Sequence, residues 1–470
     1  MTKAQLSICR VAVIGAGPSG AIATDALVKE QAFETIRVFE RQDVAGGTWV
    51  YKPNTKSHIP SLRDVVEQRA DKGVAISATF LVKQLEKRQS THICCASPTL
   101  EPLSKTLSER TLAHYGPESP FRHRDVMKKW VKDVFARGQH EHLIEFSTTV
   151  ELAEYTRGEW VLTLRKSVES QENDYWWQER FDAIVVASGH YYLPSIPDIP
   201  GMVEYDLKYP GRIKHSKHHE TSEEFSGKKV IVVGGSISAF DALHDVRQVS
   251  KLPIISSLRK LSPLFGETPF RHPDIENHSE ISSFDPETGA INFADGSVVH
   301  DVDAVIFATG YDFSFPFLPD LMSVHKRIPG LYQHVFKIDN PSLAFVGMVT
   351  GGFGIRIFEW QAVAAARILA GHASLPSRED MEEWERNRLA ERGEGGPFWT
   401  LMPDFERYFE EYRALAGEPA PGTTGRVLPR YEPAWGDVFW DFIKTRKEWW
   451  ERDARRDEEA RRRKARAWLL

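Results

Sequence analysis

The sequence predicts an α/β fold in which two similar nucleotide-binding domains are nested, and three observations support this. An apolar strand runs into a glycine-rich turn at residues 11–20, VAVIGAGPSG, and again at residues 230–239, VIVVGGSISA. A helix pattern follows each turn, as in Rossmann-like dinucleotide-binding folds. The stretches 182–189 and 303–310 also match in register, DAIVVASG against DAVIFATG, which indicates an internal repeat.

Length, charge and cysteine content limit the class of protein. At 470 residues, with 41% apolar and 27% charged residues, the chain has the composition of a soluble globular protein with more than one domain. A net charge of −6 gives no general basic surface, so we expect no nucleic-acid partner. Cys9, Cys94 and Cys95 form neither a Cys-x-x-Cys pair nor a disulfide framework, which weighs against a dithiol reductase and favours a cytoplasmic location. Neither a membrane-spanning apolar run nor a secretory leader is apparent, so we expect no membrane anchor.

The order of the turns and of the repeat predicts how the domains are nested. We expect a larger, discontinuous domain over residues 1–192 and 305–430, with a smaller domain over 193–304 between its two parts. The proline-rich segment that begins the smaller domain, LPSIPDIPG, suits a stiff joint. Periodicity predicts helices over 18–30, 124–137, 237–250 and 357–371, and hairpins that pair 160–164 with 175–181 and 290–293 with 297–300.

The last part of the chain, residues 431–470, is predicted to be a helical tail that is first aromatic and then charged. Charged pairs with i,i+4 spacing, which stabilise an exposed helix, occur at Glu451/Arg455, Glu458/Arg462 and Glu459/Arg463. We therefore expect a solvated terminal helix, and binding of a partner protein is the alternative. The oligomeric state is left open, with a homo-oligomer among the outcomes.

The first glycine-rich turn has the residues that a dinucleotide requires. Gly15 permits the tight turn, Gly17 lets the backbone approach a pyrophosphate, and Gly20 allows close contact between helix and strand. A helix that begins at Pro18 directs its N–H groups and the positive end of its dipole at the phosphates. The next strand ends on Glu40, twenty positions after Gly20, and an acid at this place accepts hydrogen bonds from a ribose 2′-hydroxyl.

The second turn departs from this pattern and is followed by the opposite charge. Ser236 stands where the second glycine is expected; it narrows the space for the backbone, although its hydroxyl can bond a phosphate. The next strand, residues 254–257, leads into Leu258, Arg259 and Lys260. A guanidinium binds phosphate through paired hydrogen bonds, so Arg259 suits a 2′-phosphate, and a plain surface arginine is the alternative. An acid-tipped and a base-tipped site in one chain predict FAD at the first turn and NADPH at the second.

The chain resembles the flavin-containing monooxygenases over roughly residues 8–372. Four segments carry the resemblance in the order found in that family: GAGPSG followed by FERQDVAGGTW, ASGHYYLPSIPDIPG, YPGRIKHSKHHETSEEFSGKKVIVVGGSISA and IFATGYD. The family pattern F-x-G-x-x-x-H-S-x-x-Y corresponds to residues 209–219, with Tyr209 at the first position and His219 at the last. Baeyer–Villiger relatives carry tryptophan at that last position, so the sequence does not favour a Baeyer–Villiger-type oxygenation.

The resemblance implies both the cofactors and the chemistry. NADPH reduces FAD, O₂ adds at the flavin C4a carbon, and the hydroperoxide transfers one oxygen atom to the nitrogen or sulfur of a small organic substrate. The protein excludes water and needs little acid–base machinery, which fits a sequence without a Ser-His-Asp or paired-carboxylate motif. His215 is implied to lie beside the nicotinamide nucleotide, in the link between the domains. A metal site could also be considered at His215, His218 and His219. No cysteine or carboxylate arrangement completes such a site, so we expect no metal.

The turns and the resemblance together predict two sets of cofactor contacts. For FAD they are Gly15, Gly17, Pro18, Ser19, Gly20, Glu40, Arg41, Gly47, Thr48, Trp49, Val150, Thr309, Gly310 and Asp312. For NADPH they are Ser188, Gly189, His215, Gly234, Ser236, Ile237, Ser238 and Arg259. In the first set, the adjacent glycines Gly46 and Gly47 let a loop pack against a flat cofactor, and a buried Trp49 would form a wall for it; a plain turn has the same pattern.

One segment departs from the family pattern. The family has L-x-T-N followed by a proline, and the asparagine helps to stabilise the flavin hydroperoxide, whereas residues 103–115 of this chain, LSKTLSERTLAHY, contain no asparagine. Ser108 and Arg110 are weak candidates for the missing catalytic group. Two alternatives follow: an NADPH-dependent flavin oxidase or reductase without oxygen transfer, or a non-catalytic nucleotide-binding protein that engages partners through its tail.

Overall fold

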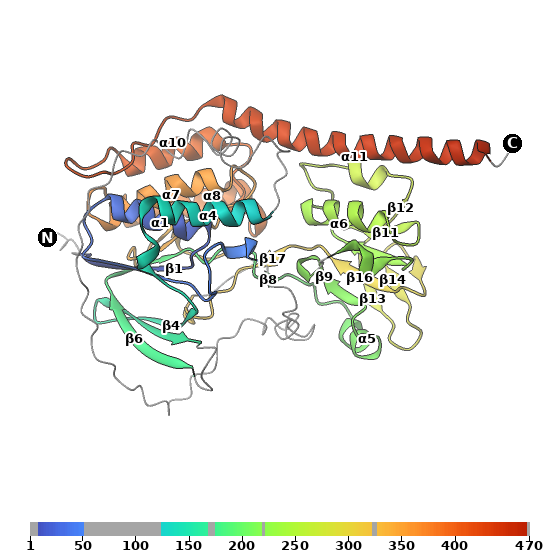
Figure 1. Cartoon of the computed structure of the whole chain (residues 1–470), viewed down its shortest axis with the longest axis horizontal. Coiled ribbons are helices and arrows are strands. Elements are labelled where there is room, and N and C mark those ends of the chain that lie inside the picture. The colour runs from blue at the N-terminus through green and yellow to red at the C-terminus, as the bar shows by residue number, and fades with distance from the viewer. Residues whose placement is uncertain (1–7, 51–123, 168–173, 219–220, 322–326, 468–470) are drawn as a thin grey trace. The chain divides into compact units, whose positions relative to one another are not determined.

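The structure is a computed structural model (Figure 1) that describes residues 8–50, 124–167, 174–218, 221–321 and 327–467. The chain forms two compact units. Unit 1 contains the described residues up to His190 and again Phe313–Gly436, and unit 2 contains Tyr191–Asp312 and Asp437–Leu470. Unit 2 thus continues past residue 304, where the sequence suggested its end, because the strand over Ala304–Phe307 pairs with the central strand of that unit.

A mixed sheet with the strand order β18-β19-β20-β7-β1-β2-β3 forms the centre of unit 1. Its strands are β1 (Arg10–Ile14), β2 (Thr35–Phe39), β3 (Ile144–Glu145), β7 (Ala183–Val186), β18 (Leu331–Tyr332), β19 (Phe336–Lys337) and β20 (Leu343–Phe345). The strands from β20 to β3 run parallel, whereas β18 and β19 pair antiparallel at one edge. β1 and β7 are buried along nearly their whole length, because a parallel strand covered on both faces has no polar side.

Helices cover one side of this sheet and a second sheet covers the other (Figure 1). The helices are α1 (Pro18–Lys29), α4 (Arg124–Gly138), α7 (Ile355–Leu369), α8 (Arg378–Arg392), α9 (Gly396–Trp399) and α10 (Phe405–Ala416), with 3-10 turns η1 (Gly47–Trp49) and η4 (Glu141–Leu143). The second sheet is antiparallel and contains β4 (Thr148–Thr156), β5 (Glu159–Lys166) and β6 (Tyr175–Phe181). These elements confirm the helices predicted over 18–30, 124–137 and 357–371 and the hairpin of 160–164 with 175–181.

Unit 2 is built on a parallel sheet with the order β12-β11-β10-β16-β9. Its strands are β9 (Ile213–His215), β10 (Val230–Val233), β11 (Ile254–Ser257), β12 (Ile275–His278) and β16 (Ala304–Phe307). From β10 the chain proceeds to β11 on one side, whereas β16 lies on the other side, so the strand order reverses beside β10. In open α/β sheets ligands bind at such a reversal, outside the carboxyl ends of the strands.

The remaining elements of unit 2 surround this sheet. They are α5 (Met202–Lys208), α6 (Ile237–Arg247), the long α11 (Pro433–Ala467), 3-10 turns η5 (Ser216–His218), η6 (Ser222–Phe225) and η7 (Thr268–Arg271), and the short strands β8 (Leu193–Pro194), β13 (Ile281–Phe284), β14 (Ile291–Phe293), β15 (Val298–Val299) and β17 (Tyr311–Asp312). The β14–β15 pair confirms the hairpin predicted over 290–300, and α6 confirms the helix predicted from residue 237. The fold class predicted from the sequence, α/β with two Rossmann-like domains, is confirmed.

The internal repeat extends to the hydrogen bonds that begin the central strands. Asp182, before β7, accepts hydrogen bonds from the N–H groups of Cys9 and Arg10 at the start of β1, at 2.9 and 2.8 Å. Asp303, before β16, accepts one from the N–H of Lys229 at the start of β10, at 2.9 Å. The matching acid in each unit therefore ties the same pair of strands together, and the repeated sequence reflects a shared construction.

The C-terminal helix α11 is buried along one face. Ile443, Trp450 and Asp453 are 6%, 1% and 6% exposed. The expectation of a solvated terminal helix is therefore wrong for this part of α11, whose aromatic residues cover apolar surface. Farther along, the prediction holds, because Glu458 pairs with Arg462 on an exposed face. None of the helices among the described residues combines the length and apolarity that crossing a bilayer requires.

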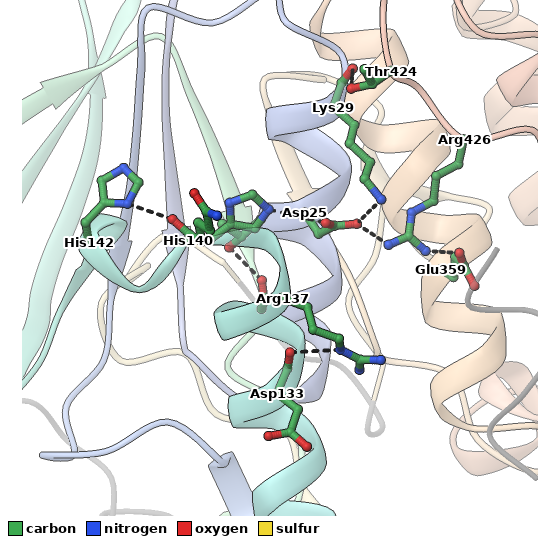
Figure 2. A network of polar contacts seen from close by, with 12 residues as sticks. Asp25, Lys29, Asp133, Arg137, His140, His142, Glu359, Thr424 and Arg426 are labelled. Carbon is green, nitrogen blue, oxygen red and sulfur yellow. Dashed lines mark hydrogen bonds and ion pairs between the residues drawn. The ribbon is translucent and has the colours of Figure 1, made fainter. Parts of the chain in front are cut away.

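Buried charges hold α1 in place within unit 1, as Figure 2 shows. The Asp25 carboxylate, on α1, contacts Lys29 Nζ at 3.0 Å and His140 Nε2 at 3.2 Å, and it is paired with Arg426. Arg426 also pairs with Glu359 on α7. Burial alone would raise the pKa of Asp25, but the neighbouring Arg426, His140 and Lys29 outweigh burial and hold that pKa below its usual range. Asp25 is therefore ionised at neutral pH and depends on its cationic partners.

Replacing Arg426 by methionine is expected to destabilise unit 1 by about 3–5 kcal/mol, because it leaves two buried carboxylates without their guanidinium. Urea unfolding of the two proteins measures the change. Arg378→Met is the matched control, because Arg378 pairs with Glu382 on an exposed helix surface and such pairs contribute little. Equal unfolding midpoints for wild type and Arg426→Met would contradict the role given to this network.

Candidate functional site

The first glycine-rich turn of unit 1 has no room for side chains. The backbone of Gly15 has a φ of +105°, and a Cβ there would lie 2.8 Å from the carbonyl oxygen of Ala187 at the end of β7. A Cβ on Gly20 would lie 1.9 Å from the carbonyl oxygen of Gly15. α1 begins directly after Gly17, with Pro18 in its first turn and no side-chain cap. The turn thus brings strand and helix into contact and leaves the N–H groups at the start of α1 available for an anion.

The loop after β2 lies against this turn. Gly46 donates its N–H to the carbonyl oxygen of Ala16 at 3.0 Å. Gly47 has a φ of +60°, and a Cβ there would lie 2.9 Å from the Cα of Gly17. The two adjacent glycines therefore let this loop pack closely against the turn, and its packing against a flat cofactor stays a prediction. Trp49 lies in the short turn η1 and is half-buried, and its place as a wall for the cofactor stays a prediction.

Glu40 is fixed at the tip of β2, beside the turn. One carboxylate oxygen accepts from the N–H of Ala16 at 2.7 Å, and the other accepts from the N–H of Gln42 at 2.9 Å. Burial raises the pKa of Glu40, and these backbone donors oppose that effect. A carboxylate offers about four acceptor sites, so Glu40 can also accept from a ribose hydroxyl. Two backbone N–H groups thus fix the predicted acid at the tip of β2, and its contact with a nucleotide ribose stays a prediction.

The second glycine-rich turn, in unit 2, has the same construction as the first, but serine and alanine replace its second and third glycines. Gly234 has a φ of +137°, and a Cβ there would lie 2.5 Å from the carbonyl oxygen of Ala308 at the end of β16. Ala239 takes the place of the third glycine, and its Cβ would lie 3.4 Å from a Cβ on Gly234. Ser236 is exposed and precedes α6 without capping it through its side chain. Its hydroxyl and the first N–H groups of α6, beginning with Ile237 and Ser238, are available to a phosphate.

The chain after β11 folds back onto this second turn. A Cβ on Gly235 would lie 2.3 Å from the carbonyl oxygen of Lys260, and the carbonyl oxygen of Gly235 accepts from the N–H of Ser262 at 3.1 Å. Arg259 and Lys260 are both exposed in this loop. Arg259 has no hydrogen bond or ion pair with another residue in the part of the chain that the structure describes. Two cationic side chains therefore stand beside the second turn, whereas an acid stands beside the first.

Five of the remaining predicted contacts follow matching strands of the two units. Ser188 and Gly189 follow β7 in unit 1, and Thr309, Gly310 and Asp312 follow β16 in unit 2. The Thr309 hydroxyl donates to the carbonyl oxygen of Ser195, and the N–H of Ser195 donates to that of Gly310 at 2.9 Å. The other predicted contacts lie elsewhere in unit 1. Val150 on β4 and Ser19 on α1 are buried. Arg41 and Thr48 are exposed. Which nucleotide each of them contacts stays a prediction.

His215 ends β9 and lies at the carboxyl edge of the sheet of unit 2. Its Nδ1 accepts from the N–H of Lys217 at 3.1 Å, and its ring centroid lies 5.3 Å from that of Tyr311. Burial lowers its pKa to about 4, so the imidazole is neutral at physiological pH. Lys217 also places its Nζ 3.9 Å from the ring centroid of Tyr192. His219 lies outside the described residues.

His190, which follows Gly189, is a further buried polar group near the end of β7 that the sequence did not single out. It is 9% exposed, and burial lowers its pKa to about 4. Its ring centroid lies 5.5 Å from that of Phe313. The signal that could have found it is its place in the family segment ASGHYYLPSIPDIPG, directly after the strand-end glycine.

Unit 2 contains one group of side chains with the spacing of metal ligands among the described residues. His272, Asp274 and Asp457 have ligand atoms within 4.8 Å of one another. Nη1 of Arg247 contacts both carboxylates, at 3.6 Å for Asp274. A guanidinium already balances their charge, so we assign the group to an ion-pair cluster. The expectation that the protein binds no metal stays a prediction, and the weak catalytic candidates Ser108 and Arg110 lie outside the described residues.

The fold and the two turns define a protein with two Rossmann-type units, and comparison with known proteins identifies its family. The family model described as flavin-binding monooxygenase-like matches residues 119–262 and 274–412. The chain belongs to this family. It is a flavoprotein monooxygenase, which confirms the resemblance and sets aside a non-catalytic nucleotide-binding protein. Family membership implies FAD, a small-molecule substrate and O₂.

Relatives match over most of their own length. Flavin-containing monooxygenase ustF2 from Aspergillus flavus is 26% identical over 475 residues, which cover 91% of this chain and 95% of the relative. Flavin-containing monooxygenase FMO GS-OX3 from Arabidopsis thaliana is 32% identical over 384 residues, which cover 81% of this chain and 77% of the relative. The structure of S-allyl-L-cysteine S-oxygenase from Allium sativum has a TM-score of 0.69 at 23% identity and covers 96% of this chain and 99% of its own. The structure of Tmm from a Pelagibacter strain has a TM-score of 0.66 at 24% identity, and the match covers 94% of this chain and 90% of that chain. At these identities the two structures establish the fold.

Gly47→Ala is expected to lower the flavin content of the purified protein, because the new Cβ meets Gly17 at 2.9 Å and forces the loop off the turn. The ratio of flavin absorbance to protein absorbance measures the change. Gly396→Ala is the control, because that glycine has nothing within 4 Å of a Cβ and no positive φ. Full flavin content in Gly47→Ala would show that this close approach is not part of the site.

The unfolding free energy is expected to fall as the pH decreases from about 6.5 to 4. Burial lowers the pKa of His190 and His215 to about 4 and that of His334, whose Nδ1 lies 2.8 Å from the Tyr408 hydroxyl, to about 3. The unfolded chain takes up these protons at about pH 6.5, so each histidine contributes a slope of up to about 1.4 kcal/mol per pH unit in this window. Urea midpoints between pH 7 and 5 measure the slope. His334→Gln should reduce it, whereas His142→Gln, at an exposed position, should not; a slope that His334→Gln leaves unchanged would contradict this assignment.

Proposed function

We propose that this protein is an FAD- and NADPH-dependent monooxygenase that transfers one oxygen atom of O₂ to a sulfur or nitrogen atom of a small organic substrate. We assign FAD to the Gly15 turn of unit 1 and NADPH to the Gly234 turn of unit 2. The observation that carries the assignment is the contrast in charge beside the two turns: Glu40 is fixed at the first, and Arg259 with Lys260 is exposed at the second. A ribose hydroxyl requires an acceptor, and a 2′-phosphate requires a cation.

The residues present fit both nucleotides. A Cβ at Gly15, Gly47 or Gly234 would collide with neighbouring backbone, so these tight turns require glycine. The helices α1 and α6 that follow the turns each begin without a side-chain cap. The N–H groups at these two helix starts would bind the pyrophosphates, which helix dipoles also favour. Bound FAD supplies the redox and oxygen chemistry, which the protein need not provide. The neutral His215, at the end of β9, would donate or accept a hydrogen bond without adding a charge beside the nicotinamide.

Sulfur or nitrogen oxygenation has support from the relatives. One of the similar structures is an S-allyl-L-cysteine S-oxygenase, and the family resemblance in the sequence points to soft nucleophiles of the same kind. Cyclohexanone monooxygenase has the same fold with a TM-score of 0.55 at 14% identity, which shows the fold alone. We also infer a cytoplasmic location, for which the support is the cysteine pattern: three cysteines and no disulfide framework.

The proposal is tested by stoichiometry. The purified protein is denatured and the released flavin identified, and the native protein is then given NADPH and O₂ with a panel of thioethers and tertiary amines. We expect FAD, and oxygenated product equal to the NADPH consumed for at least one class of substrate. NADPH consumption matched entirely by hydrogen peroxide across the panel would instead establish a flavin oxidase without oxygen transfer.

Arg259→Ala is expected to raise the KM for NADPH much more than that for NADH. Loss of a hydrogen bond to a charged group costs about 1.5–3 kcal/mol, which corresponds to a loss of roughly tenfold to a hundredfold in the preference for NADPH. Rates of nucleotide oxidation with both nucleotides give the ratio of their kcat/KM values. Arg271→Ala, which removes another exposed arginine of unit 2, should leave the ratio unchanged. If Arg259→Ala also leaves it unchanged, Arg259 does not bind the 2′-phosphate.

A further inference from the structure

The C-terminal helix α11 contacts unit 2 along a single face. The residues of this face alternate in spacing between four and three: Phe439, Ile443, Arg446, Trp450, Asp453 and Asp457. This is the spacing of a heptad seam, in which one helix keeps the same side toward its neighbour over several turns. Phe439 and the buried Ile443 and Trp450 belong to the same apolar core as Phe240 and Leu243 of α6. In Figure 1, α11 runs along the α6 side of the unit 2 sheet.

Trp450 is the centre of this contact. Its ring centroid lies 5.2 Å from that of Phe240 and 5.4 Å from that of His244, both on α6. It also lies 6.0 Å from the ring of His272, which follows η7. An aromatic side chain that is 1% exposed and packs edge-on against three rings fixes the distance between the two helices.

Charged pairs fix the register of α11 on α6. Arg446 pairs with Asp241, and its guanidinium carbon lies 5.5 Å from the ring centroid of Phe240. Farther along, Asp453 contacts His244 Nε2 at 2.7 Å.

Asp457 completes the series by pairing with Arg247, the last residue of α6. The three partners on α6 are spaced three residues apart. The contact with α11 therefore extends from the second turn of α6 to the C-terminal end of α6. Each pair is largely buried on the α6 or the α11 side, which makes the match of charges specific to one register.

α6 is the helix whose N-terminus follows the second glycine-rich turn. Its own start is not capped by a side chain, and its first residues, Ser236 and Ile237, are exposed. The position of its free N–H groups therefore depends on what holds the body of the helix. The β10–β16 sheet contacts one side of α6 through residues such as Ala239, and α11 contacts the other.

We propose that α11 is a positioning element for the nicotinamide nucleotide: Arg446, Asp453 and Asp457 set α6 so that its N-terminus meets the pyrophosphate. The inference rests on the proposed NADPH site at the Gly234 turn. The three residues act through α6 and do not themselves contact the nucleotide. The tail that the sequence presented as a separate appendage is thereby part of the nucleotide-binding unit.

The test compares NADP⁺ binding and steady-state kinetics in full-length variants. For Arg446→Ala and for Arg446→Ala with Asp453→Ala, we expect the Kd for NADP⁺ and the KM for NADPH to rise at least fivefold. The kcat at saturating NADPH should stay within twofold and the FAD content should be unchanged. Arg446→Lys, which retains the cation, should recover part of the affinity. Lys444→Ala is the control, because Lys444 is exposed on α11 and pairs only weakly with Glu448.

Unchanged NADP⁺ affinity in both Arg446 variants would overturn the inference. So would a parallel loss of FAD and kcat, because that outcome indicates general destabilisation rather than positioning. A second test exchanges the charges in the double variant Asp241→Arg with Arg446→Asp. We expect this double variant to regain most of the NADP⁺ affinity that either single variant loses. A double variant that regains none of it would also overturn the inference. Failure of the proposed function looks different, because the wild-type protein itself would then bind no NADP⁺ and Arg259→Ala would have no effect on nucleotide preference.

Discussion

In each unit, the first glycine of the turn packs against the carbonyl oxygen at the end of the neighbouring strand. Gly15 meets Ala187 in this way and Gly234 meets Ala308, and neither position has space for a side chain. This contact fixes where the helix after the turn begins, and therefore where its N–H groups lie. The matching acids Asp182 and Asp303 hold the same strands at their other ends. The two units thus use one construction, and the charge beside each turn distinguishes them.

The helices that begin at these two turns, α1 and α6, are each fixed by ion pairs between the body of the helix and neighbouring elements. In unit 1, Asp25 on α1 is buried with Arg426, and Glu359 on α7 shares that guanidinium. In unit 2, Asp241, His244 and Arg247 on α6 are paired with α11. Such pairs cost desolvation and add little net stability, but they accept only one arrangement of partners. A helix that must present its N-terminus to a phosphate benefits from this specificity more than from additional apolar contact.

Much of the fold and of the candidate site could be predicted from the sequence, because the signals are local. A strand, a glycine-rich turn, a helix and a charged residue follow one another within about thirty residues, as Gly15 and Glu40 illustrate. Three features could not be predicted in this way. Trp49 is half-buried because tertiary packing, not composition, decides exposure. The first segment of the smaller unit extends to Asp312 rather than to 304, because the pairing of β16 with β10 is not visible in a local pattern. The seam of α11 was hidden because half of its positions, including Arg446 and Asp453, are charged, so the apolar periodicity is interrupted.

The assignment of two nucleotides to two turns is tested most directly by a crystal structure of the protein with FAD and NADP⁺ bound. We expect the FAD pyrophosphate at the start of α1 with its ribose hydroxyl on Glu40, and the NADP⁺ pyrophosphate at the start of α6 with its 2′-phosphate on Arg259. A structure in which no nucleotide lies at the Gly234 turn, or in which Arg259 points away from the 2′-phosphate, would contradict the assignment.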